Sequence, residues 1–228
     1  MPRFNIGSRF ALLTAVAGAL LCGAEADDRR LALAAEVFRE VMGGGDKAIP
    51  QDLLEKSECA VIVPSLKKGA FIIGGKYGRG FLLCRNSNRV GWGSPAAVRV
   101  EGGSIGFQIG GAETDVILLV MNRRGAERLL SSKFTLGGEA SVAAGPVGRD
   151  AQAQTDASMR AEILSWSRQR GVFGGISLQG ATMREDLDVN RELYSKTMTN
   201  REVVEKNPPP PKAATALLEE LNRYSSRK

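Results

Sequence analysis

The sequence predicts an α+β fold: a single domain with a curved, glycine-rich and barrel-like antiparallel sheet, flanked by helices at its N- and C-terminal ends. Most of the 27 glycines lie between Gly69 and Gly180, often as pairs before short apolar runs. Glycine inside a strand is typical of a bulge, a sharp bend or a close approach of another backbone. Apolar residues recur at helical spacing near both ends of the chain. The glycine pairs keep no fixed period, which argues against a solenoid or a propeller.

Residues 1–26 have the layout of a secretory signal peptide. Arg3 and Arg9 precede an apolar stretch at residues 10–21, and small residues follow up to Ala26. The apolar stretch is shorter than a membrane-spanning helix requires. We therefore expect cleavage after Ala26 and an exported, periplasmic protein.

The three cysteines bear on location and on crosslinking. Cys22 follows the apolar stretch, so lipoprotein anchoring through Cys22 is an alternative to cleavage after Ala26. The large Leu21 argues against it, because a lipoprotein signal prefers a small residue there. Cys59 and Cys84 remain as a pair, which in an exported protein permits one disulfide. Burial of both as small apolar side chains is an equally good interpretation.

Helical periodicity predicts five helices. The first ends at the glycine run 43–45, Pro50 fits the first turn of the second, and Asn122 is a suitable N-cap for the third. The expected helices are residues 28–42, a short segment with Leu53 and Leu54, residues 123–132, residues 186–196, and a C-terminal segment with Leu217, Leu218, Leu221 and Tyr224.

Apolar runs bounded by glycine, proline or charged residues predict the strands. We expect a turn at residues 67–69 and a hairpin loop at residues 76–79. The expected strands are residues 59–63, 70–75, 80–84, 96–100, 103–109, 116–121, 139–144 and 162–167, with a glycine-rich hairpin arm at 172–183.

We expect the chain after residue 26 to consist of three parts. We expect the binding domain to span residues 27–206. Residues 207–212 form a proline-rich linker, since Pro208 to Pro211 favour a stiff polyproline conformation. Residues 213–228 form an amphipathic helix. We expect this helix to dock on its own domain; recruitment of another protein is the alternative.

The composition restricts the chemistry. The sequence has no histidine, which excludes the Ser-His-Asp and Cys-His nucleophile systems and removes the commonest zinc ligand. The formal net charge is +6, and removal of residues 1–26 lowers it by one unit. This mild excess favours acidic surfaces such as anionic lipid, and it falls short of a nucleic-acid binder with a concentrated basic face.

Acidic residues are the remaining candidates for chemistry. Glu113 with Asp115, or Glu185 with Asp186 and Asp188, could supply an acid and a base or an ion site. Neither group completes the pattern of an oxygen-ligand loop. We therefore expect no enzyme, no metal and no cofactor.

Basic residues gather in three places along the chain. If they converge on one face, they form a platform for phosphate head groups, to which each cation contributes on the order of 1 kcal/mol. Tyr77 and Trp92 are expected in loops beside them, where their rings can enter a membrane interface. The three groups are Lys67 and Lys68; Arg79, Arg85 and Arg89; and Arg123, Arg124, Arg128 and Lys133.

Several glycine-rich segments together resemble the SYLF domain family, also called the Ysc84 actin-binding domain. The resemblance covers roughly residues 30–200 and rests on separate motifs, which makes it specific. The motifs are residues 59–64, 71–80, 103–111 with 114–116, 134–138 and 171–180.

The resemblance implies a lipid-binding module without established catalysis. Eukaryotic members make phosphoinositide and actin contacts and attach the module to SH3 or zinc-finger domains. This chain resembles the stand-alone exported bacterial form, so we expect binding of anionic phospholipid at an envelope membrane, with actin not a partner. A structural or scaffold protein that binds another envelope protein is the alternative, and an enzyme that uses acidic residues comes third.

In this family the N-terminal amphipathic segment has been linked to membrane contact. Here that position is residues 28–42, whose polar side mixes basic and acidic residues, unlike a strongly basic membrane helix. We expect this segment to pack on the domain instead.

Overall fold

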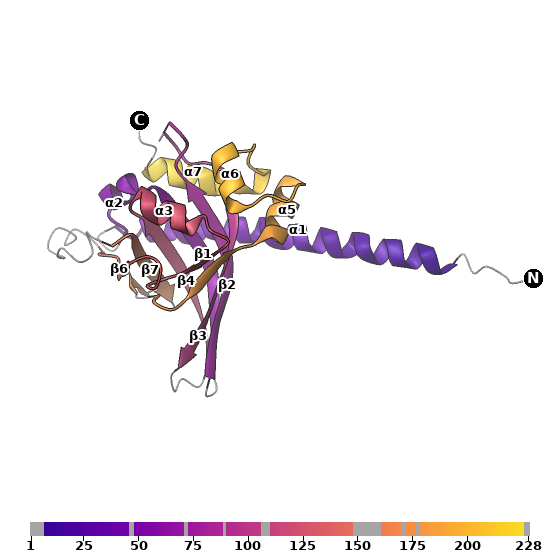
Figure 1. Ribbon diagram of the computed structural model, residues 1–228, viewed down its shortest axis with the longest axis horizontal. Helices are drawn as coiled ribbons and strands as arrows, with labels where there is room; N and C mark the ends of the chain where they lie inside the picture. Colours follow the sequence, from indigo (N-terminus) through magenta and orange to yellow (C-terminus); the bar gives the residue numbers. More distant parts are fainter. Residues whose placement is uncertain are drawn as a thin grey trace, which may run out of the picture.

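The computed structural model describes residues 7–45, 48–70, 73–88, 90–105, 110–147, 161–169, 172–176 and 178–225. Side chains are described from Glu25 onward, except at residues 68–70, 73–74, 103–105 and 110–112. The fold is α+β, as the sequence predicts: a nine-stranded sheet curls into a half-barrel, with helices against both of its faces (Figure 1).

The sheet follows the order β5-β9-β3-β2-β1-β4-β7-β6, and β8 also pairs with β7. The neighbours are antiparallel except β6 and β7, which run parallel, so the expectation of a wholly antiparallel sheet is wrong at this one pair. The strands are β1 (Cys59–Ala70), β2 (Ile73–Cys84), β3 (Ala96–Ile105), β4 (Gly110–Val120), β5 (Lys133–Thr135), β6 (Val142–Ala144), β7 (Ile163–Gln169), β8 (Val172–Gly175) and β9 (Thr182–Glu185).

Helices cover the two faces of the sheet and bury a separate apolar cluster on each. On one face, which we call the α1 face, Ile62 and Phe81 pack with Phe38 of α1 and Leu217 of α7. On the other, the α3 face, the cluster includes Leu129 of α3 and Val203 of α6. The helices are α1 (Gly7–Met42), α2 (Gln51–Lys56), α3 (Arg123–Leu129), α5 (Leu187–Tyr194), α6 (Asn200–Lys206), the 3-10 turn η3 (Lys212–Ala214) and α7 (Thr215–Tyr224).

The C-terminal helix α7 docks on the domain. Leu217 and Leu221 are fully buried, and the Tyr224 ring meets the edge of Phe38 with centroids 6.1 Å apart. The side-chain amide of Gln51 donates a hydrogen bond of 3.0 Å to the Tyr224 carbonyl oxygen. The apolar side of the amphipathic pattern is therefore used inside the domain.

The central hairpin differs from the sequence expectation. Pro64 does not end the first strand, because β1 passes through a bulge, between Val63 and Leu66 in its pairing with β4, with Ser65 at a φ of 52°. The expected turn at 67–69 lies inside β1, and the expected loop at 76–79 lies inside β2. The strands can continue because Gly78 and Gly80 carry no side chain opposite the bulge, where a Cβ would collide with β1.

Other elements shift in length. The strand expected at 96–100 and the start of that at 103–109 merge into β3, and residues 106–109 lie outside the described residues. The hairpin arm expected at 172–183 divides into β8 and β9, and α6 was not predicted at all. A capping box at Thr199 and Glu202 starts α6, a signal that the sequence carries.

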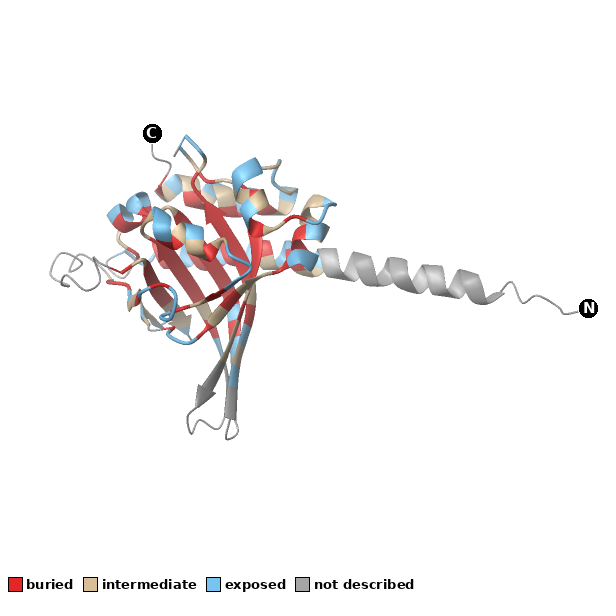
Figure 2. Ribbon diagram, in the orientation of Figure 1, coloured by how far each residue is buried: buried red, intermediate tan, exposed pale blue. Residues whose placement is uncertain are grey.

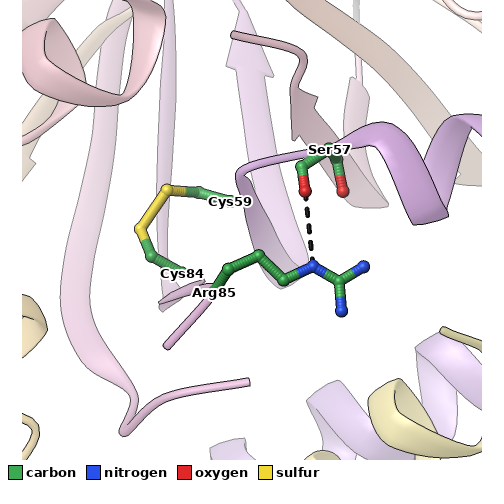
Figure 3. Close-up of a disulfide and its surroundings, with 4 residues drawn as sticks. All are labelled: Ser57, Cys59, Cys84 and Arg85. Carbon is green, nitrogen blue, oxygen red and sulfur yellow. Dashed lines mark hydrogen bonds between the residues drawn. A yellow bond between two sulfur atoms is a disulfide. The ribbon is translucent and has the colours of Figure 1, made fainter. Parts of the chain in front are cut away.

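Cys59 and Cys84 lie directly opposite each other on β1 and β2, and the structure joins them by a disulfide with an S–S distance of 2.07 Å (Figure 3). Both are also almost fully buried, at 1% and 5% exposure. The bond lies in the cluster on the α3 face. Alkylation of unreduced, unfolded protein is the direct chemical test of it.

The predicted signal peptide remains a prediction. Residues 1–6 lie outside the described residues, and residues 7–26 form the first part of α1. The side chain of Cys22 also lies outside the described ones. Within the part of the chain that the structure describes, no helix has the length and apolar character needed to cross a membrane.

Candidate anion-binding site

Four basic residues form a row across the α1 face of the sheet. The strand register places Arg79 of β2 opposite Arg99 of β3, Arg99 opposite Arg184 of β9, and Arg184 opposite Lys133 of β5. Residues directly opposite in antiparallel strands share a face and lie about 5 Å apart, so the row spans about 15 Å. We call these residues (Arg79, Arg99, Arg184 and Lys133) the basic row.

The basic row lies where the sheet leaves its helical cover. Phe81 and Ala97, one step further into the domain on the same face, are buried in the cluster under α1. The row side chains of Arg79, Arg99 and Arg184 are 36%, 35% and 40% exposed. Figure 2 shows the same change, from buried to exposed, along the strands as they leave the helices.

The next row outward carries Glu113, Lys67, Tyr77 and Glu101, and Glu113 pairs with Lys67 at 3.9 Å. Lys67 lies opposite Tyr77, and Tyr77 lies opposite Glu101, all on the face of the basic row. The Tyr77 ring is 47% exposed, and its hydroxyl accepts a 3.0 Å hydrogen bond from Arg79 Nε. Tyr77 therefore lies in a strand rather than a loop, yet it is available beside the cations as expected.

Two carboxylates partly neutralise the basic row. Glu101 lies between two arginines, with its oxygens 3.3 Å from Arg99 Nε and 3.4 Å from Arg184 Nε. Asp186, the buried N-cap residue of α5, lies 3.1 Å from Arg79 Nε. Like charges directly opposite each other destabilise a sheet, so these carboxylates offset a real repulsion. Among the described residues, two carboxylates make direct ion pairs with these four cations, and Asp27 is a third carboxylate near Arg79, which leaves a small excess of positive charge.

The charge of Arg79 is secure. Burial by itself lowers the pKa of Arg79, but the Asp186 carboxylate, the Tyr77 hydroxyl and Asp27 together raise it above its ordinary value. Arg79 is thus held as a permanent cation at the boundary between the basic row and the contact of α1 with α5. Figure 1 shows these two helices side by side next to the sheet.

At that contact two carboxyl groups approach each other. Asp27 of α1 is only 3% exposed, and it shares a hydrogen bond with Glu192 of α5. Burial, the charge of Asp27 and this hydrogen bond raise the pKa of Glu192 above its ordinary value. The folded protein therefore holds the Glu192 proton more tightly than the unfolded chain does.

This proton gives the contact a pH dependence. The stabilisation is fully present below the ordinary pKa of about 4.5 and is lost as the pH rises through the raised value. We expect Glu192→Gln, which mimics the protonated group, to melt at a higher temperature than the parent at pH 7 and at the same temperature near pH 4. Thermal unfolding at both values checks this, with the exposed Glu205→Gln as control. An equal effect at both values would contradict it.

The α3 arginines lie elsewhere. Leu129 buries α3 in the cluster on the opposite face from the basic row. Arg123 forms an ion pair with Glu127 at 3.2 Å. Glu162 forms ion pairs with Arg124 at 3.7 Å and with Arg128 at 3.0 Å. Of the residues expected to bind lipid, the structure therefore gathers Lys67, Arg79 and Lys133 on one face and keeps Arg123, Arg124 and Arg128 apart from them. The side chain of Lys68 lies outside the described ones.

Arg85 and Trp92 are structural. Arg85 is 7% exposed and Trp92 is 5% exposed, and the guanidinium lies 3.9 Å from the centroid of the indole ring. The Trp92 ring is therefore buried and cannot enter a membrane interface, contrary to expectation. Figure 3 shows that the Arg85 side chain leaves β2 on the side away from the disulfide, toward Ser57. Arg89 lies outside the described residues.

The acidic candidates form no catalytic group among the described residues. One oxygen of Asp115 accepts a 2.9 Å hydrogen bond from the Ser65 amide of β1, and the other forms a 2.8 Å ion pair with Arg168 of β7. Both oxygens are therefore used in contacts between strands. Burial raises the pKa of Asp115, although the Ser65 amide opposes this. The shallow hollow beside it has no room for a small-molecule ligand, whose sites usually measure roughly 300–1,000 Å³.

The members of the second acidic group, Glu185, Asp186 and Asp188, each contact a different structural partner. Glu185 accepts from the Asn200 amide at 3.1 Å, and Asp188 pairs with Arg191 at 2.9 Å. Asp186 faces Arg79, as described above. Within the described part of the chain, no three cysteine or acidic side chains gather in a way that could hold a metal ion.

Sequence reasoning missed Arg99 and Arg184, the two central members of the basic row. Arg99 interrupts the apolar run Ala96 to Val100, and a charge within such a run signals that one face of the strand leaves the core. Their mutual position depends on the pairing of β3 with β9, which are about 80 residues apart in the chain. Single-sequence patterns carry no information on that pairing.

Together these features define a class: an α+β domain with a basic, half-exposed strip where the sheet leaves its helical cover. The sequence model of the family described as "Ysc84: Las17-binding protein actin regulator" matches residues 101–224. This is more than half of the chain, and the chain belongs to this family.

Curated relatives agree with the family. The chain is 34% identical over 182 residues to an SH3 domain-containing protein of Schizosaccharomyces pombe, covering 78% of this chain and 42% of the relative. It is 32% identical over 182 residues to LAS seventeen-binding protein 3 of Saccharomyces cerevisiae, covering 78% and 39%. It is 28% identical over 200 residues to human SH3 domain-containing YSC84-like protein 1, covering 85% and 58%. The chain thus spans about two fifths to three fifths of these relatives.

Proposed function

We propose that this protein is a non-catalytic module that binds anionic phospholipid at a membrane surface. The observation that carries the proposal is the basic row, which presents four cations on one half-exposed strip, where two carboxylates of the described residues make direct ion pairs with them. Arginine is suited to this task because its planar fork matches phosphate oxygens in a bidentate way.

The surroundings of the basic row support a membrane rather than a soluble pocket ligand. The row is open, and Lys67 and the exposed Tyr77 lie in the adjacent row. Amphipathic rings next to cations are typical of surfaces that contact lipid head groups.

Location is part of the same proposal. The layout of residues 1–26 supports export, so we propose the bacterial envelope, with the mature protein starting at or near Asp27. Intact-mass analysis tests this directly: a retained Met1 or an acylated Cys22 would contradict it.

A protein partner is the second candidate. The family description names Las17 binding and actin regulation, and one relative is named for binding LAS seventeen. The comparisons therefore give no support to the expectation that actin is not a partner. Failure to bind any vesicle would favour this second function.

Sedimentation with vesicles tests the proposed function. We expect the protein to sediment with vesicles of phosphatidylcholine that contain an anionic lipid, and to remain in solution with phosphatidylcholine alone. Because the Debye length is about 8 Å at physiological ionic strength and about 3 Å at 1 M, binding should weaken strongly across that range of salt. Equal binding to neutral vesicles would contradict the proposal.

A further inference from the structure

The carboxylate of Glu101 occupies the middle of the basic row. It lies between the guanidinium groups of Arg99 and Arg184, close to both at once, and each partner comes from a different strand. This is the place where two arginines from adjacent strands would hold an external oxyanion. Glu101 thus fills the anion position between the two central arginines of the row.

Glu101 satisfies the charge of this position better than its hydrogen bonding. The Nε atoms of Arg99 and Arg184 are both buried, and among the described residues neither meets a hydrogen-bond acceptor of suitable geometry. The contacts at 3.3 and 3.4 Å are therefore ion pairs without good hydrogen bonds. Buried donors without acceptors cost free energy, which a better-placed acceptor recovers.

Resting on the proposed function, we infer that Glu101 is a tethered competitor that makes the basic row selective for phosphate monoesters over phosphate diesters. A monoester carries a charge of about −1.5 to −2 at pH 7 and offers three strong acceptor oxygens. A diester carries a single charge, as the carboxylate does, and two such oxygens. The tether gives Glu101 a high effective concentration at the site.

Displacement of Glu101 therefore depends on what replaces it. A diester gains nothing in charge over the carboxylate it must displace. A monoester gains charge and brings a third acceptor oxygen, which gives the two Nε–H groups more ways to form good hydrogen bonds. The chemical class that the row accepts is thus a terminal phosphate, as on phosphatidic acid, while phosphatidylglycerol is a poor ligand.

Two kinds of vesicle with matched zeta potential separate these cases. We expect the parent protein to bind phosphatidic acid vesicles about tenfold more tightly than phosphatidylglycerol vesicles, a ratio equivalent to about 1.4 kcal/mol. Glu101→Gln should raise the affinity for phosphatidylglycerol vesicles by a similar factor, so that the ratio of the two affinities becomes smaller. Glu205→Gln makes the same charge change on α6, which packs on the other face, and should leave the preference unchanged.

Soluble competitors test the inference on the parent protein alone and separate head group from free phosphate. Glycerol 3-phosphate should release the protein from phosphatidic acid vesicles at a lower concentration than dimethyl phosphate does. Equal binding to the two vesicles together with equal competition would overturn the selectivity while leaving the proposed function in place. Binding to neither vesicle would overturn the proposed function itself.

Discussion

Replacement of Gly80 by alanine is expected to destabilise the domain by about 3 kcal/mol, because a methyl group there collides with backbone. Gly80 lies in β2 opposite the bulge of β1. A Cβ at this position would lie 2.7 Å from Val63 Cα and 2.9 Å from the Ile62 carbonyl carbon, and closer still to the Ile62 oxygen. Backbone in the centre of a buried sheet cannot move aside as a flexible side chain can.

Thermal and urea unfolding measure this effect. For a chain of this length, about 3 kcal/mol corresponds to a fall of roughly 6–12 °C in the melting temperature. Gly75→Ala is the matched control, because Gly75 lies in the same strand and a Cβ there meets nothing within 4 Å. Equal melting temperatures for the two variants would contradict the bulge geometry.

Replacement of Arg85 by methionine is expected to cost about 3 kcal/mol and to loosen the C-terminus. The guanidinium donates to the carbonyl oxygens of Ser225 at 2.6 Å and of Leu54 at 3.0 Å. It also stacks on Trp92, whose indole N–H donates to the same Ser225 oxygen at 3.1 Å. Methionine keeps the apolar stem but leaves buried carbonyl oxygens unpaired.

Hydrogen exchange distinguishes this local effect from a general loss of stability. Amides in α7 should exchange faster in Arg85→Met than the fall in global stability accounts for. Arg201→Met is the control, since Arg201 is an exposed member of an ion pair on α6 and should cost less than about 0.5 kcal/mol. Unchanged protection of α7 would show that Arg85 does not hold the C-terminus.

The sequence predicts the classes of the elements well and their connections poorly. Alternation and helical spacing locate β7, α3 and α7 because local burial produces those patterns. The same reasoning fails at Pro64, where a bulge rather than a strand end accommodates the proline. Glycine density did indicate close backbone approach, and Gly80 is the position where this is most severe.

The candidate site was predictable only in part. Lys67 and Arg79 were visible as basic residues near expected turns, and Lys133 as a member of the basic group along the helix expected at 123–132. Their shared face depends on strand pairing. Arg85 has the same charge but is buried, because it contacts the nearby Trp92 and also Ser225 at the end of α7, which is remote in sequence. Charge clusters in sequence therefore identified candidates, and only the register of the sheet could sort them.

The central claim is that the basic row, rather than the arginines of α3 and α6 on the opposite face, binds anionic lipid. Sedimentation with phosphatidic acid vesicles of two double variants, R99Q/R184Q and R123Q/R201Q, tests it most directly, because both remove two positive charges. With each cation near the surface worth about 1 kcal/mol, we expect R99Q/R184Q to bind at least about tenfold more weakly than the parent. R123Q/R201Q should bind nearly as the parent does. Equal losses in the two variants would contradict the claim and indicate binding through net charge alone.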